Sequence, residues 1–268
     1  MKKTSIVIFC LPLLFALTLA GNAGAYNADY THTIYASDYI PIIDGTYIMD
    51  DEWVASGTEY FGDNGIFRDE WTMSPNYACL LIETTDATND AGDYWVICYD
   101  STAEGTTTEP DGGPAPTEYD YKLVVTGHGT SATVEWFKGT GSGWTSVTPS
   151  ETLCQLNQSL TETPKIETEH YVLELAIDKS DTSLGSYPMG YNWAQYVAYY
   201  DAHQGGNGLQ QWPPTPASAD VPDSWGYIIY EMAMNPEPDI PETTGFIVML
   251  TLSSVAVAGA VFLGKRKK

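Results

Sequence analysis

The chain has 268 residues, with 11 basic and 35 acidic side chains and a formal net charge of −24. All 35 acids but only five of the basic groups lie between residues 26 and 244, because six basic residues occupy the two ends. A body this acidic repels phosphate backbones and anionic headgroups, which excludes nucleic-acid binding and docking of the body onto an anionic membrane.

The first 25 residues have the three parts of a secretory signal peptide. Lys2 and Lys3 form a positive start, residues 6–20 are apolar, and Ala23-Gly24-Ala25 has the small-x-small pattern of a cleavage site. The alternative is an uncleaved N-terminal anchor, but the apolar stretch is short for a bilayer span. We therefore expect residues 1–25 to be removed and the mature chain to begin at Tyr26.

Short runs rich in β-branched and aromatic residues follow, separated by turns that contain glycine. Residues 171–177 alternate with period two, which is typical of a strand with one buried face. Outside the two ends, no run of 11 or more residues has a helical stripe. About nine strands in residues 26–234 therefore predict an all-β fold, an antiparallel β-sandwich. The clearest predicted strands are 77–83, 94–99, 121–125, 133–137, 171–177, 195–201 and 226–232.

An acidic segment, residues 86–93, lies between two predicted strands. Asp86, Asn89, Asp90 and Asp93 supply three carboxylates and an amide within eight residues. Oxygen-rich sets of this kind suit Ca²⁺, a hard cation that takes six to eight oxygen ligands. The segment lacks the spacing of an EF-hand. The sequence predicts a calcium site here, and the alternative is an acidic, solvated hairpin loop.

Three of the eight tryptophans are candidates for a sugar-binding platform. Trp144 follows a glycine-rich turn, Trp193 precedes a predicted strand, and Trp212 lies beside two prolines. An exposed indole face stacks on the C–H face of a sugar, and polar groups such as Asp201 and Gln210 would bond its hydroxyls. The alternative is that these loop tryptophans fold back over the sandwich. Trp53, Trp136 and Trp225 are interpreted as packing residues.

Other chemistry has weak signals in this sequence. The four histidines, His32, His128, His170 and His203, lack metal-binding spacing and are interpreted as surface residues. Nothing local singles out a histidine as a haem ligand, so haem is not expected. The glycines of 139–143 precede no helix and form a turn, so no nucleotide site is expected. No hydrolase motif is present, and we expect a non-catalytic protein.

The C-terminal end has the pattern of a membrane anchor. Residues 235–244 contain three prolines and predict an extended linker. Residues 245–264 carry no charge and would be about 30 Å long as a helix, which matches a bilayer core. Residues 265–268 are all basic, which predicts a cytoplasmic tail and an outward-facing ectodomain. A buried core helix is the alternative.

This end also resembles the sorting tails of archaeal and bacterial surface proteins. Ile240-Pro241-Glu242-Thr243-Thr244 stands where those tails have a short motif containing Pro and Glu. The resemblance implies that a sortase-like enzyme would cut the tail and remove the helix. A plain single-pass anchor is the simpler expectation.

Two early motifs and two later ones resemble family 9 carbohydrate-binding modules and related DOMON-like domains. The early ones are Pro41-Ile42-Ile43-Asp44-Gly45 and Asp51-Glu52-Trp53-Val54-Ala55. The later ones are the glutamate-containing strand 171–177 and Trp225-Gly226-Tyr227-Ile228. The resemblance spans roughly residues 34–232. It implies a β-sandwich, often with structural calcium, and sugar binding by stacking in some members. Other relatives bind haem.

These observations predict a membrane-anchored surface protein of an archaeal-type prokaryotic cell. Its expected activity is reversible binding of a glycan or another cell-surface polymer. The alternatives are a structural or adhesive protein without a small ligand, and a redox domain that carries haem.

Overall fold

The computed structural model describes residues 27–47, 52–53, 56–62, 65–72, 76–100, 113–148, 154–178 and 193–231. All of them belong to the first of two compact units, Met1–Met234. The predicted signal peptide, linker, membrane helix and basic tail lie outside the described residues. Among the residues that are described, no helix is long and apolar enough to cross a membrane.

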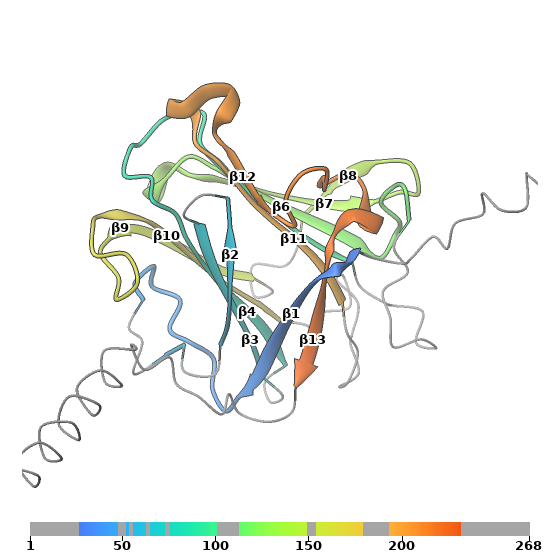
Figure 1. The fold of residues 1–268 in the computed structure, drawn as a ribbon, viewed down its shortest axis with the longest axis horizontal. Coiled ribbons are helices and arrows are strands. Elements are labelled where there is room, and N and C mark those ends of the chain that lie inside the picture. Colours follow the sequence, from blue (N-terminus) through green and yellow to red (C-terminus); the bar gives the residue numbers. More distant parts are fainter. Residues whose placement is uncertain are drawn as a thin grey trace, which may run out of the picture. The chain divides into compact units, whose positions relative to one another are not determined.

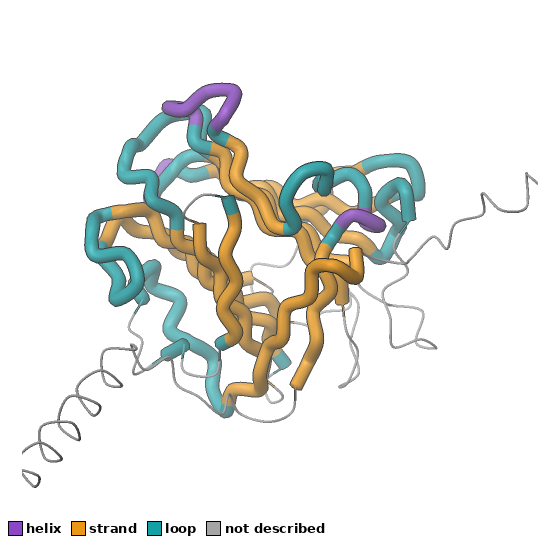
Figure 2. Tube along the Cα trace, in the orientation of Figure 1, coloured by secondary structure: helices purple, strands orange, loops and turns teal. Residues whose placement is uncertain are grey.

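The described part consists of thirteen strands and three short 3-10 helices (Figures 1 and 2). The strands are β1 Asn27–Ser37, β2 Gly57–Phe61, β3 Gly65–Thr72, β4 Tyr77–Glu83, β5 Tyr94–Asp100, β6 Asp120–Thr126, β7 Thr133–Gly139, β8 Trp144–Val147, β9 Cys154–Thr161, β10 His170–Asp178, β11 Trp193–Tyr200, β12 Leu209–Trp212 and β13 Gly226–Glu231. The 3-10 helices are η1 Gly129–Ser131, η2 Ala202–Asn207 and η3 Pro222–Ser224.

The strands form one curled sheet in the order β8-β7-β6-β5-β11-β13-β1-β3-β4-β10-β9, with β12 paired to β11 and β2 to β3. The sheet turns at β13 and β1, so that its two halves face each other across a shared core (Figure 1). Strand β1 runs parallel to both of its neighbours, β13 and β3. The sheet is therefore mixed, which corrects the prediction of a purely antiparallel sandwich.

The seven strands named from the sequence are confirmed as β4, β5, β6, β7, β10, β11 and β13. Strand β3 was missed because its middle residues, Arg68, Asp69 and Glu70, are charged and nevertheless buried. Arg68 lies 3.9 Å from the Glu83 carboxylate, and Asp69 lies 3.4 Å from the His32 ring. Buried charges of this kind need partners from other strands, and a local pattern does not show such partners.

The main core lies between the two halves of the sheet. On β10, Tyr171, Leu173, Leu175 and Ile177 face this core, which confirms the period-two prediction. The residues that β5 and β11 contribute include Trp95, Ile97 and Val197. Apolar side chains of this size each stabilise the fold by about 1.5–3 kcal/mol when fully buried.

A second, smaller core covers the outer face of β4 and β10. It contains Tyr47, Trp53, Cys79, Leu81, Val172 and Ala176. At its centre the buried Glu174 carboxylate accepts hydrogen bonds from Asp44 N at 2.9 Å, Gly45 N at 2.7 Å and Trp53 Nε1 at 3.0 Å. Three of the motifs that carry the family resemblance therefore meet at one side chain. Burial raises the pKa of Glu174 to about 7, although these hydrogen bonds act in the opposite direction.

A third core covers part of the outer face of β5 and β11. Trp225 and Ala217 pack there over Cys98, Ala194 and Tyr196. Trp53, Trp136 and Trp225 are all buried, so their interpretation as packing residues is confirmed. Cys79, Cys98 and Cys154 form no disulfide with one another.

Candidate functional site

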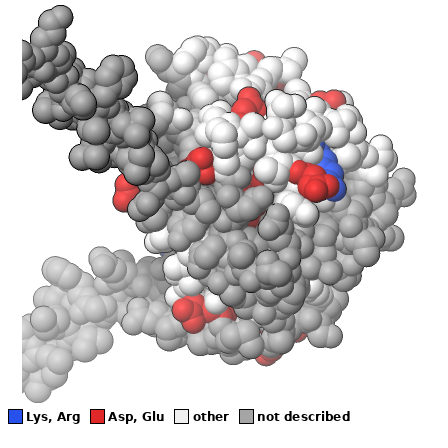
Figure 3. Space-filling view, turned by 90° about the vertical axis from the view of Figure 1, so that its right-hand side faces the viewer, with Lys and Arg blue, Asp and Glu red and all other residues white. Residues whose placement is uncertain are grey.

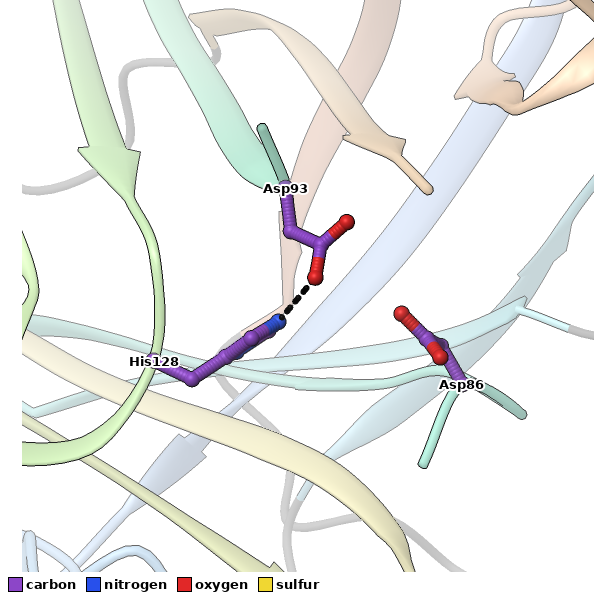
Figure 4. A group of neighbouring side chains, drawn as sticks. All are labelled: Asp86, Asp93 and His128. Atoms are coloured by element: carbon purple, nitrogen blue, oxygen red, sulfur yellow. Dashed lines mark hydrogen bonds and ion pairs between the residues drawn. The ribbon is translucent and has the colours of Figure 1, made fainter. Parts of the chain in front are cut away.

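A buried polar network closes one end of the sandwich, around His128 in the turn after β6. The Nε2 atom of His128 lies 3.0 Å from an Asp93 oxygen (Figure 4). Its Nδ1 atom lies 3.3 Å from Oε1 of Gln158. The imidazole stacks on the Tyr171 ring at a centroid distance of 3.5 Å. The network thus joins β9, β10, the β6–β7 turn and the acidic segment that precedes β5.

Asp86 belongs to the same network. Its Oδ1 accepts hydrogen bonds from the backbone N–H and the hydroxyl of Thr88, both at 2.7 Å. Its Oδ2 accepts a hydrogen bond of 2.5 Å from the Tyr199 hydroxyl. Burial, together with this bond, raises the pKa of Tyr199. Both oxygens of Asp86 are thus already engaged by protein donors.

A second acidic group lies beside this network and consists of Asp90, Asp93 and Asp201. One oxygen of each lies within 4.8 Å of the others, as is also true of the donor atoms of Asp86, Asp93 and His128. Asp93 accepts hydrogen bonds of 2.8 Å from Asp90 N and from Ala202 N, so it links the acidic segment to η2. Asp201 caps η2 by accepting a hydrogen bond from His203 N at 2.8 Å. Figure 1 shows the segment before β5 running beside η2.

The structure therefore regroups the predicted metal ligands. Asp90 and Asp93 meet Asp201, which the sequence had suggested as a sugar-binding residue, whereas Asp86 faces His128 (Figure 4). Asn89 is exposed. The all-oxygen group, Asp90–Asp93–Asp201, matches the ligand preference of Ca²⁺ better than the group that includes a histidine nitrogen.

Two of the three predicted platform tryptophans are buried. Trp193 is 5% exposed and Trp212 is 4% exposed. Trp193 packs on Tyr99, and Trp212 packs on Phe67 and over Gly226, where an added Cβ would lie 2.1 Å from the indole. Both strands direct these side chains into the main core. The expectation that they present open indole faces is therefore wrong.

Trp144 is partly exposed and held on several sides. Its Nε1 donates a hydrogen bond of 2.7 Å to Asp220, and its ring lies parallel to that of Trp225 at 6.5 Å. The Lys122 ammonium lies 4.5 Å from the ring centroid. Gln210 is half-buried and packs against Gly62. A Cβ added at Gly62 would lie 2.6 Å from the Gln210 side chain. The structure thus does not bring Trp144, Trp193, Trp212, Asp201 and Gln210 together at one surface.

Sequence reasoning missed an aromatic pair at one end of β5 and β11. Tyr94 on β5 and Tyr200 on β11 are cross-strand neighbours, with ring centroids 5.0 Å apart and an interplanar angle of 17°. Both are partly exposed, whereas Trp95 and Tyr199 point into the core. In the chain, Tyr94 directly follows Asp93, and Tyr200 directly precedes Asp201. Only the pairing of β5 with β11 reveals it, because more than a hundred residues separate the two tyrosines.

The histidines also differ from expectation. His32, His128 and His170 are buried, and only His203 is exposed among the four. His32 lies near Asp69 and Glu59, and His170 lies 3.4 Å from Glu83. A buried imidazole requires a polar partner, and each of the three has a carboxylate within reach.

No family model and no curated protein matches the chain. Among solved structures, the chain is similar to a family 9 carbohydrate-binding module from Caldicellulosiruptor kristjanssonii in complex with glucose. The TM-score is 0.51 at 15% identity, over 78% of this chain and 100% of that one. A likeness at this identity shows the fold alone, so it confirms the predicted β-sandwich and does not establish a ligand.

Proposed function

We propose that this protein is a non-catalytic carbohydrate-binding module. One observation carries the proposal: a sandwich similar to that of a glucose-bound module keeps a pair of tyrosines, Tyr94 and Tyr200, partly exposed on its outer face. Aromatic rings bind the apolar C–H faces of sugars. The proposal therefore rests on Tyr94 and Tyr200 and no longer on buried indoles.

We also propose calcium as a scaffold ion rather than a reactant. Asp90, Asp93 and Asp201 would hold it, and the positive charge would offset the repulsion among three neighbouring carboxylates. Because these residues come from the acidic segment and from the cap of η2, the ion would link two loops. Asp86 would stay in the hydrogen-bond network of Tyr199.

The cellular setting is part of the proposal. The signal-like start, the apolar segment 245–264 and the basic tail support a single-pass protein of a prokaryotic, archaeal-type cell. Its ectodomain would lie outside and its C-terminus in the cytoplasm. Processing by a sortase-like enzyme is the alternative fate of the tail.

One observation favours a second function, a structural or adhesive surface protein without a small ligand. It is the burial of Trp193 and Trp212, the aromatics that would otherwise be the obvious sugar platform. On the face shown in Figure 3, acidic side chains are scattered, which suits solvation of the surface.

Glycan binding distinguishes the two functions. The purified protein, kept in mild detergent, would be run through native gels that contain one soluble polysaccharide each, with calcium or with a chelator. Retardation by at least one polysaccharide supports the module. Unchanged mobility in every gel, combined with a melting temperature that falls with chelator, supports the structural alternative.

A further inference from the structure

Strand β9 forms a free edge of the curled sheet. It pairs with β10 along its whole length, and no described strand pairs with its other side (Figure 1). A free edge presents unpaired backbone N–H and C=O groups to any other strand. Proteins therefore keep such a strand short, place charges or proline on it, interrupt it with a bulge, or cover it.

Strand β9 lacks every one of these protections except a possible cover. It has eight residues, its pairing with β10 contains no bulge, and its sequence CQLNQSLT has no charged residue and no proline. This absence of charge occurs in a chain with 35 acidic residues. The opposite edge of the sheet, β8, has only four residues and is protected by its shortness. A cover is thus the protection that remains for β9.

The middle of β9 contains an acceptor motif for N-linked sugars, Asn157-Gln158-Ser159. No other asparagine in the chain is followed two residues later by Ser or Thr. A motif this short arises often by chance, so its position in the fold is the observation that gives it weight. Here the motif lies on the one long edge strand that has no other protection.

The fold exposes the asparagine of this motif. Gln158 is buried, and its Oε1 lies 3.3 Å from Nδ1 of His128. Because successive side chains of a strand point to opposite faces, Asn157 points outward, and it is exposed. Its Oδ1 accepts a hydrogen bond of 2.9 Å from Gln158 N, whereas its Nδ2 has no hydrogen-bond partner among the described residues. The atom to which a sugar would be joined is therefore accessible.

The serine of the motif is held by the segment that covers β10. Ser159 Oγ donates a hydrogen bond of 2.5 Å to Gly45 O, and a Cβ added at Gly45 would lie 2.9 Å from the Gln158 carbonyl carbon. Gly45 therefore lies over Gln158 and Ser159 and leaves Asn157 uncovered. A sugar chain on Nδ2 would extend along the free edge without displacing this segment.

We propose that Asn157 is N-glycosylated and that the attached sugar chain covers the free edge of β9. The inference goes beyond the proposed function and shares with it only the outward location of the domain. The donor is a sugar chain joined through phosphate to a membrane lipid, and a transferase catalyses the step. Nδ2 forms a bond to C1 of the first sugar while the C1–O bond to phosphate breaks. The lipid phosphate leaves with the electron pair, and the amide proton passes to a base of the transferase.

The test uses the full-length protein purified from the membranes of the cells that produce it. Trypsin cuts after Lys138 and Lys165, so Asn157 lies in a peptide that contains no other asparagine. Mass spectrometry should show this peptide heavier by at least one sugar residue, and fragmentation should place the added mass on Asn157. Asn157→Gln and Ser159→Ala should each remove the added mass. Ser159→Thr is the matched control, because it keeps the hydroxyl and should retain the sugar.

The covering role has a separate readout, self-association measured by light scattering over a range of protein concentrations. Asn157→Gln should self-associate at lower concentration than the parent protein, because its β9 edge is uncovered. Gln155 is exposed on the same face of β9. The double variant Asn157→Gln/Gln155→Lys places a charge on the edge and should reverse the self-association without restoring the sugar.

Each contrary result has a separate meaning. A peptide of unmodified mass would overturn the modification site. An added mass that persists in Asn157→Gln would belong to a Ser or Thr hydroxyl and would overturn the N-linkage. Equal self-association of the parent protein and Asn157→Gln would overturn the covering role. Polysaccharide binding in native gels tests the proposed function independently of all three results.

Discussion

Glu174→Gln tests how the segment over the outer face of β4 and β10 is held. The carboxylate accepts two backbone N–H groups on Oε2 and the Trp53 indole N–H on Oε1. Glutamine has the same shape but only one acceptor oxygen. Its less costly orientation keeps that oxygen on Asp44 N and Gly45 N and turns its NH₂ group toward the indole N–H. One buried donor is then left unpaired.

An unpaired buried donor costs about 1–3 kcal/mol. At pH 8 glutamine also removes a buried charge, whose cost is seen in the pKa of about 7, so we expect Glu174→Gln to lower the free energy of unfolding by less than about 3 kcal/mol. Urea unfolding at pH 8, followed by circular dichroism, measures it. Glu167→Gln is the matched control, because Glu167 is exposed and precedes the same strand. The control should change stability by less than about 0.5 kcal/mol.

A double-mutant cycle identifies the indole as the responsible donor. Trp53→Phe removes the N–H, so Glu174→Gln in that background no longer sets two donors against each other. We expect its cost to fall, with a coupling energy of about 1–2 kcal/mol between the two positions. Equal costs of Glu174→Gln in both backgrounds would refute the view that the indole–carboxylate bond holds the segment.

Three further outcomes are expected. Trp212→Ala should destabilise the fold by about 3–5 kcal/mol, because it leaves a cavity at a buried site. It should not change glycan affinity under conditions in which the variant is folded. A loss of affinity in the folded variant would contradict the argument from burial. Asp90→Asn should reduce any calcium-dependent rise in melting temperature, whereas an unchanged rise would place the ion elsewhere. Stability should fall as the pH increases. Burial lowers the pKa of His32, but the Asp69 and Glu59 carboxylates have a larger, opposite effect, so the pKa of His32 is raised above 6.5. Burial also raises the pKa of Asp69 above 3.8. Both groups then bind protons more tightly in the folded state, so their contribution is full at low pH and is lost as the pH passes their folded pKa values; melting temperatures that increase from pH 5 to pH 9 would contradict this sign.

Strand positions were predictable where the local pattern was complete. Residues 171–177 alternate between core-facing and outward-facing side chains, and the structure places β10 there. Strand β3 was not predictable, since Arg68, Asp69 and Glu70 acquire their partners only when β1, β2 and β4 lie beside them. The parallel pairing of β1 likewise depends on segments that are far apart in the chain.

The candidate site divides in the same way. The acidic segment 86–93 was visible as a cation-binding pattern, because its carboxylates are close in sequence. The pairing of β5 with β11 brings Asp201 to Asp90 and Asp93. It also places Tyr199 where its hydroxyl bonds Asp86. The exposure of Trp193 and Trp212 was predicted wrongly because a residue beside a turn can point to either face of a strand. Only the direction of the pleat decides which face it is.

The sequence by itself determined the β class, the acidity of the body and the short-range acidic pattern. These are properties of composition and of neighbouring residues. The tertiary structure decided the mixed pairing of the sheet, the burial of Trp193 and Trp212, and the placement of Tyr94 beside Tyr200. Strand order and pleat direction bring distant residues to one face, and both are set by the packing of the whole sheet.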